Sequence, residues 1–123
     1  GKFEKAEGPV KGHNVEPIYF DIEIKKDKEF KFKLPLLHNS FIYLIDGTIK
    51  IGEEKHKNVQ DSTLILLSNG QNLRVIAKSD AKFLLISGKP INEKIARGGP
   101  FVMNTKSEIL QAVQDYHNGN FVK

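Results

Sequence analysis

The chain has no cysteine and a single methionine among its 123 residues. The absence of cysteine excludes disulfide bonds, thiolate metal ligands and a cysteine nucleophile. No apolar run approaches the roughly 18 residues that a membrane-spanning helix needs, and the first residues carry no signal-peptide pattern. We therefore expect a protein of the cytoplasm, or of the nucleus in a eukaryote, with no membrane partner. Because the chain begins with Gly1 and its methionine is Met103, we also expect a designed or proteolysed fragment.

Arginine is scarce as well, since Arg74 and Arg97 are the only arginines among 19 basic residues. The formal net charge is +4, but the lysines alternate with acids, as they do in residues 23–29. Proteins that read DNA usually cluster arginine on one element. Scattered lysines more often provide solubility and protect sheet edges. The sequence predicts no specific nucleic-acid partner.

The composition is that of one soluble globular domain, with 39% hydrophobic and 28% charged residues. The length suffices for one self-sufficient core and is too short for two. Residues 1–16 contain Gly8, Pro9 and Gly12 and show little periodicity. They predict an irregular amino-terminal arm.

From Pro17 onward, apolar and polar residues alternate with the period of a β-strand, first over residues 18–24 and then over 30–34. The continuous apolar run at 41–45 predicts a strand that is buried on both faces. Asp46-Gly47 is a strong turn signal and predicts a hairpin with residues 48–51. Further strands are predicted at 63–67, 73–77 and 83–87. Many short strands at this spacing favour an all-β sandwich or barrel.

The last part of the chain changes to a helical pattern. Thr105 is placed to cap a helix, and Glu108 completes a capping box three residues later. Gly119 is placed to end that helix. An apolar stripe at helical spacing follows the cap and consists of Ile109, Ala112, Val113 and Tyr116.

Segment 98–109, which reads Gly-Gly-Pro-Phe-Val-Met-Asn-Thr-Lys-Ser-Glu-Ile, closely resembles a signature of the pirin family. Segments 41–52, 61–70 and 88–93 resemble, in the same order, the central strands of a cupin and the pirin segment before the signature. Pirins are two-cupin proteins, and the resemblance is to their C-terminal half. It implies a cupin-type double-stranded β-helix, a jelly-roll barrel, with one C-terminal α-helix.

The expected organisation is a single domain in three parts. Residues 1–16 form the arm, residues 17–97 form the cupin barrel, and residues 98–123 form the C-terminal strand and helix.

In the family, one iron is held by three histidines and a glutamate of the N-terminal cupin, which this sequence does not contain. Registered on Gly47, the first three cupin ligand positions fall on Lys33, Pro35 and Ser40, and registered on Gly70 the last falls on Leu73. None of these is a metal ligand, although imidazole and carboxylate are what iron requires. We expect no catalytic residue, metal or other cofactor in this domain, and iron in the N-terminal cupin.

The four histidines are His13, His38, His56 and His117, and no two of them have His-x-His or helical spacing. Each is expected to be a surface or loop residue. His117 falls at the end of the predicted helix, where a cation favours the dipole. His38 is the best exception, because it precedes the buried strand at the barrel mouth. Even so, it is interpreted as a loop residue with local hydrogen bonds.

The resemblance also implies that the C-terminal strand and helix reach toward the N-terminal cupin. The candidate contacts with that half, with another protein or with a second copy of the chain are Phe101, Val102, Ile109, Val113 and Tyr116. We expect the apolar stripe, or the apolar residues beside it, to be partly uncovered in this chain. The alternative is that the stripe packs fully on the domain's own sheet.

Three functions remain open. The favoured one is a metal-free structural or interaction half that supports an iron-binding N-terminal cupin. The second is a part of an enzyme similar to quercetin 2,3-dioxygenase, which needs a metal. The third is a protein-binding module of a transcription cofactor, a role that nuclear pirins have.

Overall fold

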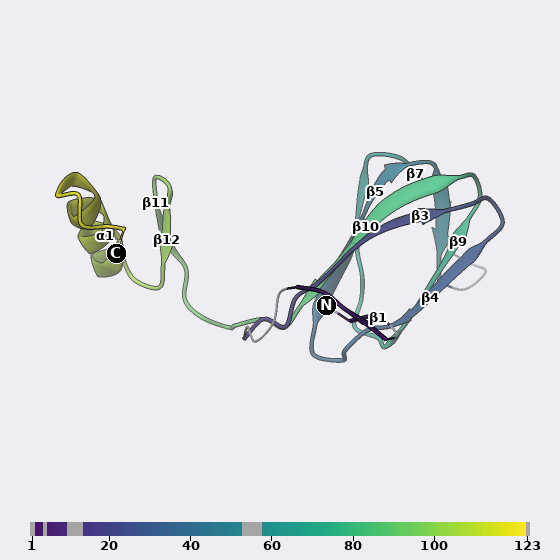
Figure 1. Ribbon diagram of the computed structural model, residues 1–123, viewed down its shortest axis with the longest axis horizontal. Coiled ribbons are helices and arrows are strands. Elements are labelled where there is room, and N and C mark those ends of the chain that lie inside the picture. Colours follow the sequence, from purple (N-terminus) through teal and green to yellow (C-terminus); the bar gives the residue numbers. More distant parts are fainter. Residues whose placement is uncertain (1, 4, 10–13, 53–57, 123) are drawn as a thin grey trace. The chain divides into compact units, whose positions relative to one another are not determined.

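The computed structural model in Figure 1 describes residues 2–3, 5–9, 14–52 and 58–122. The chain forms two compact units, Gly1–Pro90 and Ile91–Lys123. The first unit holds two four-stranded antiparallel sheets, and the second holds a strand pair and the helix.

The predicted all-β architecture with one helix is confirmed. One sheet of the first unit has the strand order β3-β10-β5-β8, and the other has the order β4-β9-β6-β7. The strands of the first sheet are β3 (Ile18–Ile24), β10 (Ala81–Gly88), β5 (Asn39–Asp46) and β8 (Thr63–Leu66). Those of the second are β4 (Glu29–Lys33), β9 (Asn72–Ala77), β6 (Thr48–Ile51) and β7 (Val59–Gln60). Of these eight strands, the short strand β7 alone had no counterpart among the predicted strands.

The core lies between the two sheets and is supplied by alternate residues of the central strands. In β10, Phe83 and Leu85 are completely buried, while the residues that alternate with them are half-buried on the opposite face. β10 lies between β3 and β5 in Figure 1 and pairs with both along most of its length. Burial of each such side chain stabilises the fold by about 1.5–3 kcal/mol. The other fully buried large side chains are Ile42, Leu44, Ile49 and Val75.

The predicted hairpin between residues 41–45 and 48–51 is wrong. β5 pairs with β10 and β8, whereas β6 pairs with β7 and β9. The turn at Gly47 therefore carries the chain from one sheet to the other. A turn dipeptide specifies a local change of direction, and the strand partner is decided by packing. Gly47 adopts φ +90°, and a Cβ atom there would lie 2.2 Å from the carbonyl oxygen of Asp80.

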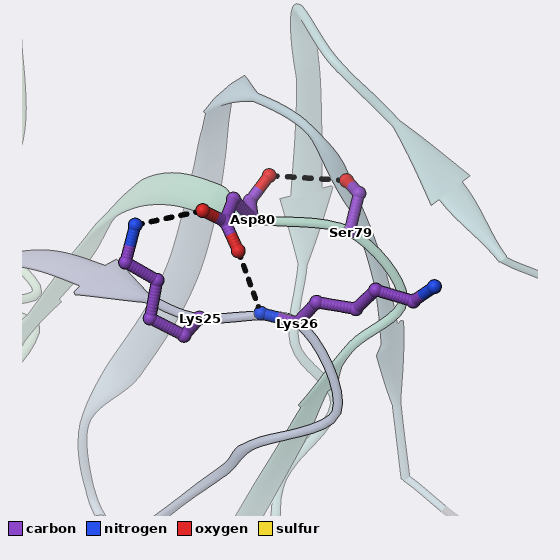
Figure 2. Close-up of polar contacts among 4 residues, drawn as sticks. All are labelled: Lys25, Lys26, Ser79 and Asp80. Carbon is purple, nitrogen blue, oxygen red and sulfur yellow. Dashed lines mark hydrogen bonds and ion pairs between the residues drawn. The ribbon is translucent and has the colours of Figure 1, made fainter.

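Polar contacts join three turns at this end of the first unit. Asp80 accepts hydrogen bonds from the Lys25 ammonium at 2.7 Å and from the Lys26 backbone N–H at 2.8 Å (Figure 2). The bond from Lys25, followed by that from Lys26, lowers the pKa of the Asp80 carboxyl, and Asp80 raises the pKa of Lys25. The Ser79 hydroxyl accepts from the Thr48 N–H at 2.9 Å, so the turn after β5 is held to the same corner.

The amino-terminal residues that the structure describes are more regular than the predicted irregular arm. β1 (Lys2–Phe3) pairs with β2 (Ala6–Glu7). The Phe3 ring lies 5.6 Å from the Phe20 ring in an edge-to-face arrangement and 6.1 Å from the Phe32 ring. Aromatic packing of this kind anchors the short strand pair to the barrel, which the sequence pattern did not reveal.

The second unit begins with the pair β11 (Ala96–Gly98) and β12 (Phe101–Met103) and continues into α1 (Lys106–His117). The predicted capping box is confirmed, because the Thr105 hydroxyl accepts from the Glu108 N–H and the Glu108 carboxylate accepts from the Thr105 N–H. Gly119, with φ +72°, follows the end of the helix as predicted. In the described part of the chain, no helix is long and apolar enough to cross a membrane.

Replacement of Gly47 by alanine is expected to destabilise the first unit by more than about 2 kcal/mol, because its φ is positive and its Cβ would collide with backbone atoms. Denaturant unfolding measures the change. Gly70→Ala is the matched control, since a Cβ there meets nothing within 4 Å, and its stability should be unchanged or raised by up to about 1 kcal/mol. Equal effects of the two substitutions would contradict this account of the corner.

The helix cap is expected to weaken in acid. Hydrogen bonds from the Thr105 hydroxyl and N–H and from the Asn104 N–H lower the pKa of Glu108 from 4.5. A carboxyl whose pKa is depressed by folding stabilises the helix above the pKa of the unfolded chain and loses that contribution as the pH falls through its folded pKa. NMR can follow the protection of the Thr105 and Glu108 amides against hydrogen exchange from about pH 7 to about pH 2. This protection should decrease at pH values below 4.5. In Glu108→Gln it should vary less over the same range.

Candidate functional site

A cavity of about 360 Å³ opens between the two sheets, at the end of the barrel away from the Asp80 corner. β4 runs away from that corner, since it begins just after the Lys25–Lys28 turn and ends at Lys33 next to Leu34. Leu34 donates its N–H to the carbonyl of Gln71 at 2.7 Å, which joins β4 to the loop before β9 at the cavity. The lining residues are mostly apolar and are Leu34, Ile51, Gly52, Val59, Ile65, Leu66, Leu67, Ser68, Gly70, Asn72, Leu73 and Arg74.

The positions at which a cupin places its metal ligands do not form a ligand set here. Lys33 and Pro35 are exposed, whereas Leu73 is 5% exposed and lines the cavity together with Leu34. Leucine offers no donor atom to a metal, so the residues that face the cavity at these positions do not fit an iron ion. Among the residues that the structure describes, no group of three or more His, Asp or Glu side chains could hold a metal ion.

Ser40, the remaining ligand position, belongs to a polar cluster at the end of the first sheet. The Ser40 hydroxyl donates to the Ser87 hydroxyl at 2.8 Å, and Nδ1 of His38 lies 3.1 Å from the same Ser87 oxygen. Nε2 of His38 lies 3.8 Å from a carboxylate oxygen of Glu16. If Ser87 donates to Nδ1, the imidazole proton sits on Nε2 and faces the Glu16 carboxylate.

This arrangement corrects the expectation for His38. The side chain is buried, whereas a surface or loop histidine with local bonds was predicted, and its main partner Ser87 is 49 residues distant. The signal that could have revealed the cluster is the alternation in β10, because Ser87 occupies an inward position in register with Phe83 and Leu85. A serine at an inward position needs a hydrogen-bond partner.

The pair of serine and histidine has no accessible nucleophile. Ser87 is 2% exposed and His38 is 8% exposed, so no substrate carbonyl can approach the Ser87 hydroxyl in this structure. The Ser87 hydroxyl also accepts a hydrogen bond from Ser40. To act as a general base, His38 would have to take the proton of a hydroxyl that contacts the substrate. The cluster therefore acts as a structural tie between β10 and the loop before β5.

The other histidines are placed as follows. His117 lies exposed in the last turn of α1, as predicted. His13 and His56 lie outside the described residues, so their predicted surface positions stay predictions.

The predicted contact residues all lie in the second unit. Val102 and Tyr116 are exposed, while Phe101, Ile109 and Val113 are half-buried. The Phe101 ring lies 6.2 Å from the Tyr116 ring, which packs β12 against the helix. Within the stripe, Ala112 is buried against the second unit itself and Tyr116 is 65% exposed. Whether a partner contacts these residues stays a prediction.

A second apolar surface, of which the sequence pattern indicated only the run at 41–45, lies on the outside of sheet β3-β10-β5-β8. We call it the outer face, and it is made of two neighbouring rows of side chains that the strand registers place side by side. One row runs Tyr19, Ile86, Phe41 and Leu66, and the other continues from Asp21 through Leu84, Tyr43 and Leu64. Seven of these eight positions are apolar or aromatic.

The outer face is open to solvent in this chain. Leu66 is 77% exposed, Leu64 57% and Tyr19 61%, and Tyr43 is 39% exposed. The prediction that residues 41–45 are buried on both faces is therefore wrong for this chain. Ile42 and Leu44 are fully buried, but the side chains that alternate with them, at positions 41, 43 and 45, are not. Their apolar character fits a face that a further protein surface covers, since exposed apolar patches of this kind mark interaction sites.

The two antiparallel sheets around one core, with a short helix after them, define a cupin-type jelly roll. A crystal structure of quercetin 2,3-dioxygenase from Acinetobacter baumannii superposes with a TM-score of 0.87 at 29% identity, over 100% of this chain and 42% of that one. The family model of the pirin C-terminal cupin domain matches residues 19–122. The chain belongs to the pirin family, in agreement with the resemblance of its 98–109 segment.

Relatives with pirin names are similar over most of this chain. A pirin-like protein of Solanum lycopersicum is 39% identical over 104 residues, which make up 83% of this chain and 36% of the relative. Human pirin is 33% identical over 104 residues, covering 82% of this chain and 36% of that protein. The chain thus spans about two fifths of the length of the proteins it matches.

Replacement of Ser87 by alanine is expected to destabilise the first unit by about 1–3 kcal/mol, because a buried imidazole nitrogen loses its partner. Ser68→Ala is the matched control, since Ser68 is exposed, and its effect should stay within about 0.5 kcal/mol. Urea unfolding of both variants measures the difference. A Ser87→Ala variant as stable as the wild type would show that the cluster contributes nothing to the fold.

Proposed function

We propose that this chain is the non-catalytic half of a two-cupin protein, a metal-free structural and interaction domain that docks onto an iron-binding N-terminal cupin. The outer face carries this proposal. It is a continuous apolar surface across four strands of a sheet whose other side already forms the core.

The size of the relatives supports an N-terminal cupin as the occupant of the outer face. The family model describes a C-terminal domain, and the relatives are more than twice as long as this chain. In such proteins a further domain precedes the matched region. An apolar face flanked by charged groups is typical of contacts between protein domains, and here Lys82 lies 3.3 Å from Glu23 and 3.8 Å from Asp21 at the edge of the face.

The metal-free part of the proposal is supported by the chemistry of the cavity. Leu34 and Leu73 face the interior where a metal centre would need nitrogen or oxygen donors. His38 is the histidine nearest in sequence to the cupin ligand positions. Its imidazole is hydrogen-bonded to Ser87 in the polar cluster and does not line the cavity. On this proposal, any chemistry that depends on iron belongs to the N-terminal cupin.

A second candidate is a part in a flavonol-oxidising enzyme. The similarity to the quercetin 2,3-dioxygenase of Acinetobacter baumannii favours it. It is compatible with the first proposal, because this chain would then support the half that holds the iron. The contribution of this domain is the same in both cases: a rigid barrel with an apolar docking face.

Docking is tested by co-expressing this chain with the N-terminal cupin half of a pirin-family relative as a separate polypeptide. We expect the two to co-purify, and the double substitution Leu64→Lys and Leu66→Lys to weaken their association at least tenfold, because both side chains would be desolvated at the interface. Isothermal titration calorimetry of the purified halves measures the affinity.

Ile95→Lys is the control, since Ile95 is 76% exposed and belongs neither to the outer face nor to the predicted contacts in the second unit. Association that is lost in Val102→Lys but kept in the double variant would assign docking to the second unit instead. Iron is measured in the same samples by elemental analysis. Stoichiometric iron in this chain alone would contradict the metal-free assignment.

A further inference from the structure

The cavity at the open end of the barrel has the size and lining of a ligand site. Its volume of about 360 Å³ lies within the range of about 300–1,000 Å³ that is typical of small-molecule pockets. We propose that it binds a small, uncharged and largely apolar molecule with one hydrogen-bonding end. This goes beyond the docking role, because the cavity takes Ile65 of β8 whereas the outer face takes Leu64, and Leu66 at the strand end is the one residue that belongs to both.

Most of the side chains that line the cavity are apolar. Leu34 and Leu73 are almost fully buried, and Ile51, Val59, Ile65 and Leu67 are half-buried and pack against the core. These half-buried side chains leave apolar surface available to a guest molecule. An apolar guest would remove that surface from water, which contributes about 25 cal/mol for each Å².

Among the lining residues that the structure describes, the polar side chains are those of Ser68, Asn72 and Arg74. The Arg74 guanidinium is hydrogen-bonded to Glu29, and that bond is the main cause of the lowered pKa of the Glu29 carboxyl. The guanidinium therefore has an acidic partner within the protein, although Glu29 also pairs with the Lys31 ammonium at 2.9 Å. A ligand with a net charge would have to replace this pair, whereas a neutral hydroxyl or carbonyl group needs only one hydrogen bond from the rim.

Water that lies against the leucine, isoleucine and valine side chains of the cavity receives no hydrogen bond from them. Displacement of weakly held water by an apolar group favours binding.

The probe for the test is N-phenyl-1-naphthylamine, a neutral aromatic amine whose fluorescence rises in apolar surroundings. Titration into the whole chain is expected to give saturable binding with one site. Ile65→Trp, which fills the cavity, should weaken binding at least tenfold. Leu64→Trp is the matched control, because it places the same side chain one residue away on the outer face, and its affinity should stay within twofold of the wild type.

A second measurement on the wild type does not depend on the folding of a variant. In methyl-labelled protein, the probe should shift the NMR signals of Ile51, Val59, Ile65 and Leu73 and leave those of Leu64 unchanged. Two results would overturn the proposal: no saturable binding, or shifts confined to the methyl groups of the outer face. The outcome is independent of docking, which is measured without the probe.

Discussion

The close approach of Gly47 to the backbone of Asp80 and Ala81 is the constraint on which the arrangement of the two sheets depends. A Cβ atom at position 47 would lie 2.2 Å from a carbonyl oxygen, so only glycine lets the chain pass from β5 to β6 at this point. The hydrogen bonds of Asp80 and Ser79 hold the neighbouring turns at the same corner. With this end closed, the two sheets face each other, and the core residues of β5, β9 and β10 meet between them.

Backbone atoms pack closely at the Gly47 corner, and the cavity and the outer face lie elsewhere on the first unit. At the other end of the barrel the strands end in loops, and the space between them stays open as an apolar cavity. On the outside of the first sheet, alternation along the strands brings a second set of apolar side chains together. The domain thus combines a cavity that Leu73 lines at a cupin ligand position with an outer face on which apolar side chains gather. The proposed supporting role rests on these two properties.

The sequence predicted what depends on local periodicity. The strands, the capping box at Thr105 and Glu108, the helix end and the family follow from patterns within short segments, and each is confirmed. What failed depends on contacts between distant segments. Asp46-Gly47 is equally compatible with a hairpin and with a corner, and only the pairing of β5 with β10 decides between them.

The same limit applies to the candidate site. The burial of His38 depends on Ser87 at the far end of another strand, which spacing cannot reveal. The outer face was half recognised, because the apolar run at 41–45 was expected to be buried on both sides. The rows that extend it to Tyr19, Leu64 and Leu66 appear only when strand registers are known.

The most direct test of the central claim is a crystal structure of this chain in complex with the N-terminal cupin half of a pirin-family relative. If the outer face docks onto the N-terminal cupin, the Leu64 and Leu66 side chains, 57% and 77% exposed here, will be buried against that domain. If they remain exposed while the two domains meet through another surface, the proposed role of the outer face is wrong.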